Sequence, residues 1–265
     1  MWVFFGNLGR SVIATLGGAG YSCLMLLQTL RMFHLALPRW RTVVQQMYIT
    51  GVQSLLVSMM FAGFAGMILA LQTGIEIRKY GLESRIGSIV ALSMLREMGP
   101  LMTAIILTGR IGSSMAAEIG TMAVSEEIDA LETMAIDPVK FIVLPRVMAM
   151  ALVAPMVAIM SSTIGILGGA FVSWAQIGVN FETYLISARW AVEFRDIYWG
   201  IGKAVIFGIA ISTIACANGI RTRGGALGVG QASRNAVVTT LVIVIVFNYM
   251  MSSFFLAFDP GVPKG

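Results

Sequence analysis

Five stretches of the chain are mostly apolar, and each is long enough to cross a lipid bilayer. A transmembrane helix needs about 20 residues, and only helices and closed barrels satisfy their backbone polar groups inside a membrane. The pattern therefore predicts an all-α integral membrane protein. We place its spans at about 48–71, 86–109, 147–173, 200–219 and 236–258.

The composition supports a single membrane domain over residues 1–265. The chain is 57% hydrophobic and 12% charged, with a mean hydropathy of +0.85, whereas soluble domains are about half apolar and a quarter charged. A net charge of +5 would suggest nucleic acid as the partner of a soluble protein. In a membrane protein the same charge sets topology and meets anionic headgroups, so we expect no nucleic-acid partner.

Two further segments predict helices that lie along the membrane surface. In residues 3–36, small and polar residues recur at steps of three and four, which places them on one stripe of an interfacial helix. A sixth span at about 12–36 is the alternative. Residues 174–199 are rich in aromatic and charged side chains, a composition typical of helices at headgroup depth.

The basic residues of the loops indicate the orientation, because cytoplasmic loops carry an excess of lysine and arginine. One side of the predicted topology has ten and the other six, so we expect the N-terminus to be cytoplasmic and the C-terminus periplasmic. The ten are Arg10, Arg31, Arg39, Arg41, Arg110, Lys140, Arg146, Arg221, Arg223 and Arg234; the six are Arg78, Lys79, Arg85, Arg189, Arg195 and Lys264.

The longest polar stretch, residues 110–146, predicts a short acidic helix between the second and third spans. Ser125 is a suitable N-cap, and Asp137 with Pro138 would end this helix and begin the next. At 100° per residue, three acids share one face and three apolar residues the opposite face, while Glu127 falls outside the acidic stripe. The acids are Glu126, Asp129 and Glu132, and the apolar residues are Ile128, Leu131 and Ala135. A solvated connector is the simpler interpretation.

Arg96 and Glu97 fall near the middle of the second span. A charge at that depth costs about 2.5–3.5 kcal/mol on insertion scales, so both should face protein or a water-filled cavity. Adjacent helical residues point about 100° apart, so the two need not pair with each other. Either they form buried contacts between helices, or they line a lipid cavity in which Arg96 binds a phosphate headgroup. Gly99 and Pro100 predict a kink beside them.

Two other features have simpler interpretations. Lys203, near the outer end of a span, is expected to snorkel toward the headgroups. The run GGALGVG at 224–230 is expected to form a flexible cytoplasmic turn.

Three motifs resemble one known family. The run from SMLREMGPL (93–101) through GRIGSSMAAEIGTM (109–122) to EEIDALETMAIDP (126–138) is similar to the signature of the MlaE (YrbE) permeases, the membrane subunits of Mce-type ABC lipid transporters. The resemblance covers nearly the whole chain. It implies that the acidic helix is a coupling helix, which docks on an ATPase through Glu126, Glu127, Ile128, Asp129, Leu131, Glu132 and Met134. It also implies that Leu69, Ile77 and Tyr80 lie near the mouth of a lipid cavity.

The resemblance further implies an assembly in the bacterial inner membrane. Five spans make half a transporter, so we expect a homodimer with the lipid cavity at its two-fold interface. The family implies two ATPase subunits inside, a hexamer of Mce-domain (MlaD-like) proteins outside and a STAS-domain (MlaB-like) protein on the ATPase. The implied cargo is phospholipid, moved between inner and outer membranes to maintain outer-membrane lipid asymmetry.

The sequence itself predicts no catalytic, cofactor or metal site. A phosphate-binding loop ends in Gly-Lys-Ser/Thr, but the only Gly-Lys pair, Gly202–Lys203, is followed by Ala204 within a span. ATP and Mg²⁺ would therefore bind to a partner. Cys23 and Cys216 lack the spacing of metal ligands. An ion-coupled secondary transporter or channel is one alternative, which the lack of an internal repeat disfavours. A non-transporting membrane scaffold is the other.

Overall fold

The computed structural model describes residues 17–18, 20–32 and 40–258, and over these residues it contains helices and no strands. Within these residues, five helical rods are long and apolar enough to cross a membrane. Short α6 (Glu127–Thr133) joins the second rod to the third, and α8 (Phe181–Ala191) joins the third to the fourth. The first rod is α2 (Trp40–Arg78), the fourth is α9 (Phe194–Ile220) and the fifth is α10 (Gly225–Phe258). The second rod consists of η2 (Glu83–Arg85), α3 (Ile86–Ser93), η3 (Met94–Met98), α4 (Gly99–Leu107), η4 (Thr108–Gly112) and α5 (Ser113–Val124). The third consists of η5 (Val139–Val143), α7 (Leu144–Val172) and η6 (Ser173–Ile177).

The all-α fold with five candidate spans is confirmed, and each predicted span lies inside one rod. The rods are longer than predicted. The main difference is at 110–124, which we assigned to the polar connector but which continues the second rod as η4 and α5. This part was wrong because α5 is amphipathic: Met115, Ala116 and Ile119 are buried, so packing keeps the segment helical past Arg110 and its neighbouring serines.

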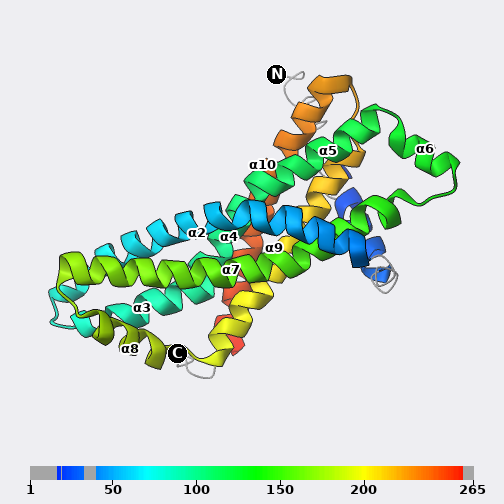
Figure 1. The fold of residues 1–265 in the computed structure, drawn as a ribbon. Helices are drawn as coiled ribbons and strands as arrows, with labels where there is room; N and C mark the ends of the chain where they lie inside the picture. The colour runs from blue at the N-terminus through cyan, green and yellow to red at the C-terminus, as the bar shows by residue number, and fades with distance from the viewer. Residues whose placement is uncertain (1–16, 19, 33–39, 259–265) are drawn as a thin grey trace, which may run out of the picture.

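The third rod lies at the centre of the molecule, whereas α2 and α10 are largely exposed (Figure 1). α2 and α7 run side by side. Their backbones approach so closely that a side chain at Gly66 would collide with the Gly165 carbonyl, and one at Gly168 would lie 2.6 Å from the Gly63 oxygen. Small residues allow this approach between membrane helices, and Gly63 and Gly66 are packing points of α2.

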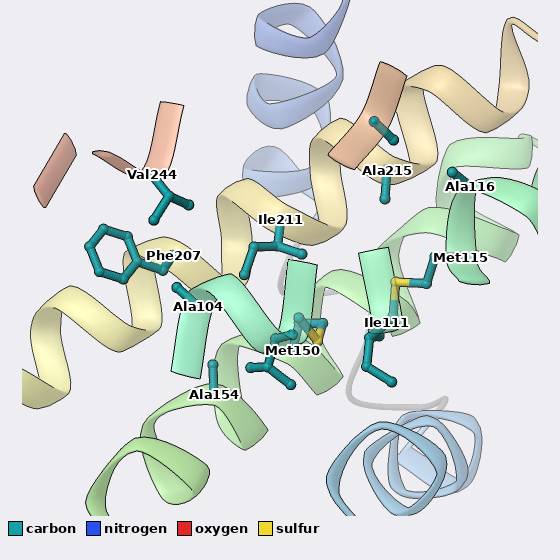
Figure 2. Close-up of a cluster of buried hydrophobic side chains, with 12 residues drawn as sticks. Ala104, Ile111, Met115, Ala116, Met150, Ala154, Phe207, Ile211, Ala215 and Val244 are labelled. Carbon is teal, nitrogen blue, oxygen red and sulfur yellow. The ribbon is translucent and has the colours of Figure 1, made fainter. Parts of the chain in front are cut away.

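The largest buried apolar cluster joins the second, third, fourth and fifth rods (Figure 2). Phe207 and Ile211 of α9 and Met150 of α7 belong to this cluster, and α10 contributes Ala236 and Val244. Ala104 and several other alanines fill the remaining space, so the helices lie close together. This core fixes the second rod against α9, where the charged residues of the spans are found.

Opposite ends of the molecule carry the two short helices (Figure 1). At one end, residues 20–31 form a helix whose Met25 is buried in an apolar cluster shared with α5, α6, η5, α7 and α9. The helix falls within the predicted interfacial segment 3–36, most of whose other residues lie outside the described ones. At the other end, α8 packs on α3 through a 2.7 Å contact between the Ser88 and Ser187 hydroxyls. Trp190 is 85% exposed there, which suits the predicted headgroup position.

Candidate functional site

The second rod widens into a π-helical turn, η3, at the position of Arg96 and Glu97. Such turns inside α-helices are frequent at functional sites. Pro100 lies two residues after this turn. It has no N–H to donate to the carbonyl four residues earlier, which is that of Arg96. The Nζ of Lys203 donates to this Arg96 oxygen over 3.0 Å. A π-helical turn thus lies directly before Gly99–Pro100, where we predicted a kink, and a side chain of α9 donates to its backbone. The kink itself stays a prediction.

Glu97 holds together three rods through one carboxylate. Its Oε1 accepts from Lys203 Nζ of α9 at 2.6 Å and from the Ser252 hydroxyl of α10 at 2.7 Å, while its Oε2 accepts from Asn248 Nδ2 at 3.0 Å. Lys203 also donates to Ser252 Oγ at 2.8 Å, so its three N–H groups all have acceptors.

The expected position of Lys203 was wrong. The side chain is 2% exposed and points into the protein, whereas we expected it to snorkel to the headgroups. The reason is that the Glu97 carboxylate and the Arg96 carbonyl supply acceptors within the helix packing, so the ammonium group has no need to reach water.

Arg96 pairs with a different acid. Its Nε donates to Asp196 Oδ1 of α9 over 2.6 Å, and its guanidinium lies 5.1 Å from the centre of the Phe255 ring. Asp196 is 1% exposed and also belongs to the capping box of α9, in which its Oδ2 accepts from the Glu193 N–H. The expectation that Arg96 and Glu97 need not pair with each other is confirmed. Sequence reasoning missed Asp196, although an acid three residues after Glu193 at the start of a span was a visible signal.

A small cavity of about 260 Å³ opens beside these charges, lined by Leu92, Ser93, Arg96, Glu97, Ser252 and Phe255. The Arg96 and Glu97 side chains are each 36% exposed. Among the described residues, none accepts a hydrogen bond from Nη1 or Nη2 of Arg96. Both nitrogens are therefore available to an anionic or polar group in the cavity.

The other three predicted cavity residues are not brought to this place within one chain. Leu69 packs in the apolar cluster around Val90 and Met94. Ile77 is half-buried near the end of α2, and Tyr80, beyond that end, is 77% exposed. Their position at a cavity mouth stays a prediction.

The short helix α6 forms as predicted, but its ends differ. Ser125 does not cap it: the Ser125 hydroxyl bonds back to the Thr121 carbonyl of α5 at 2.9 Å. Glu126 precedes α6 in a left-handed conformation, with φ of 61°, and Ala135 follows it with φ of 58°. Asp137 does act as a cap, because its Oδ1 accepts from the Val139 N–H at 2.8 Å.

The acidic face of α6 borders a cavity of about 510 Å³. Glu126, Asp129 and Glu132 line it from one side, and Arg223 with the turn between α9 and α10 lines it from the other. Glu127 is not in the lining, but Ile128, which was predicted on the opposite face, is. Of the apolar residues predicted to contact the ATPase, Ile128 is buried and Leu131 partly buried against the core, whereas Met134 is exposed.

The expected flexible turn at 224–230, which adjoins the cavity beside α6, is mostly helix: Gly224 and Gly225 have positive φ, and α10 begins at Gly225. Arg221, at the end of α9, lies 5.6 Å from the centre of the Tyr21 ring. Burial raises the pKa of the Tyr21 phenol above its ordinary value, an effect that Arg221 opposes.

Comparison with known proteins identifies the family. The family model described as permease MlaE matches residues 43–254. A probable ABC transporter permease of Synechocystis is 37% identical over 212 residues, 80% of this chain and 81% of that protein. The chloroplastic protein TRIGALACTOSYLDIACYLGLYCEROL 1 of Arabidopsis thaliana is 39% identical over 216 residues, 82% of this chain and 62% of the plant protein. The intermembrane phospholipid transport system permease MlaE of Haemophilus influenzae is 33% identical over 256 residues, 94% of this chain and 96% of its own. The chain belongs to the MlaE permease family.

Proposed function

We propose that this chain is the membrane permease subunit of an ABC transporter that moves phospholipids between the inner and outer membranes. The similarity to the Haemophilus phospholipid permease extends over 94% of the chain. The observation that carries the proposal is the Arg96 guanidinium, which lies within an apolar span, with two nitrogens available to the cavity beside it. Arginine binds phosphate through such a planar fork.

The cavity suits an amphiphile. Leu92 and Phe255 offer apolar surface for an acyl chain next to the Arg96 and Glu97 charges. At 260 Å³ it holds only part of a phospholipid, so we propose that a second copy completes it at the two-fold axis of a homodimer. Leu69, Ile77 and Tyr80 would line the mouth of the completed cavity.

In the proposed assembly, the α6 end faces the cytoplasm and the α8 end the periplasm. The ATPase docks on α6 and provides the ATP and Mg²⁺ site, so this chain needs no cofactor. The acidic lining at Glu126, Asp129 and Glu132 favours a basic surface on that ATPase. An Mce-domain hexamer would stand outside, and a STAS-domain protein on the ATPase. The chain would lie in the bacterial inner membrane with its N-terminus inside and its C-terminus outside.

We predict that the purified chain does not hydrolyse ATP, and that the complex with its ATPase does. In proteoliposomes, the complex should transfer labelled phospholipid to an acceptor only when ATP is present. Transfer driven by an ion gradient in the absence of ATPase would support the secondary transporter or channel. No transfer by an intact, ATP-hydrolysing complex would support the scaffold.

Reversing the acidic face of α6 should disrupt the ATPase contact. We expect Glu126→Lys with Asp129→Lys and Glu132→Lys to lower co-purification of the ATPase at least tenfold, because three attractive contacts become repulsive. The chain should still insert, since exposed charges contribute little to stability.

A matched control reverses three acids at the opposite end of the molecule, Glu76, Glu83 and Glu182. ATPase recovery should be unchanged in this variant. Equal recovery with both triple variants would show that α6 is not the coupling contact.

A further inference from the structure

The helix α6 is carried on two arms, and each leads into a different rod. One arm is α5, the end of the second rod, and the other is η5, the start of the third. α6 itself buries only Ile128 fully. A force applied to α6 by a partner would therefore reach the membrane spans mainly through these two arms.

The arm formed by α5 is fixed to α9 by steric packing. A side chain on Gly120 would lie 2.9 Å from the Thr222 hydroxyl, and one on Gly219 would lie 2.7 Å from Cβ of Ile119. Helices in such close contact shift as one body, because any relative movement creates a clash or a void. The second and fourth rods are thus already joined at this end.

The third rod is joined to α5 by a charged contact. Arg146 of α7 donates from Nη2 to Glu118 Oε1 of α5 over 2.6 Å, across 28 residues of sequence. Arg146 is 7% exposed, and its Nη1 donates to the Ile142 carbonyl at 3.2 Å, which fixes the guanidinium against η5. Among the described residues, its buried Nε has no acceptor. Of the acids that the structure describes, Glu118 is the one paired with this buried charge, and its side chain is 57% exposed.

We propose that Glu118 and Arg146 are positioning residues that tie the two arms of α6 together, so that α5 and α7 respond to the ATPase as a unit. This inference rests on the proposed function. Apolar contacts at Ile142, Val143 and Val147 hold the third rod near Ile119. Such contacts are non-directional, so they do not fix the orientation of the third rod relative to α5. The ion pair adds a directional link, because hydrogen bonds to a charged group have preferred geometry. Without it, the two arms would respond to α6 separately, so that movement of α5 and α9 would not be matched by movement of α7.

The test measures lipid transferred per ATP hydrolysed by the reconstituted complex. We expect Glu118→Gln to assemble with the ATPase and to hydrolyse ATP, but to lower this ratio about fivefold or more, the usual size of a coupling between sites. Glu118→Asp, which keeps the charge but withdraws it by one methylene, should give an intermediate ratio. If Glu118→Gln does not assemble, Glu118→Asp alone provides the readout.

The matched control is Glu76→Gln, which alters an ion pair with Lys79 that is exposed at the opposite end. It should leave the ratio unchanged. An unchanged ratio in Glu118→Gln, or in Glu118→Asp if only that variant assembles, would overturn the inference even if the melting temperature fell, since a merely structural pair lowers stability without altering the ratio. If the unmodified complex transfers no lipid with ATP, the proposed function itself fails.

Discussion

Glu97→Leu is expected to destabilise the protein by about 3–5 kcal/mol, because removal of one partner of a buried ion pair leaves the other charge uncompensated. The charge left behind is that of Lys203, which is 2% exposed. Lys203→Met should cost less, since Glu97 is 36% exposed and keeps Ser252 and Asn248 as donors. The measurement is the thermal unfolding of the detergent-solubilised chain.

The double variant separates charge from packing. Glu97→Leu with Lys203→Met removes both charges and should recover most of the lost stability, since apolar replacement of a buried pair is often neutral. Glu76→Leu provides the comparison, because its pair with Lys79 is exposed and should contribute about 0–1 kcal/mol. If Glu97→Leu unfolds at the temperature of the unaltered chain, the network does not hold the three rods together.

The sequence predicted those features that depend on local patterns. An apolar run long enough to cross a bilayer specifies a span by itself, so all five were found. Helical periodicity placed three acids on one face of α6, and all three line one cavity, although Glu126 precedes the helix in a left-handed conformation. Arg96 and Glu97 were identified because charges are rare at such depth.

The sequence could not predict which residues pair between helices. Asp196 and Lys203 lie about 100 residues beyond their partners, and no local pattern indicates that α9 turns both of them toward η3. Buried contacts between helices were one of the two interpretations of Arg96 and Glu97, but their partners, Asp196 and Lys203, could not be named from the sequence. The ends of α6 were missed for a related reason: residues with positive φ are unusual outside glycine, so nothing in Glu126 or Ala135 predicted the turns found there.

Arg96→Gln is expected to weaken phospholipid binding by about 1.5–3 kcal/mol, or roughly ten- to a hundredfold, the range for a hydrogen bond to a charged group. It also leaves Asp196 buried without its cation, so stability should fall. Asp196→Asn is the matched variant, because it removes the same ion pair but keeps the guanidinium beside the cavity. We therefore expect Asp196→Asn to retain co-purified phospholipid, measured by mass spectrometry of the purified complex. Combining Arg96→Gln with Asp196→Asn should restore the melting temperature but not the lipid. Full phospholipid occupancy in Arg96→Gln would show that this side chain holds helices together and does not bind the headgroup.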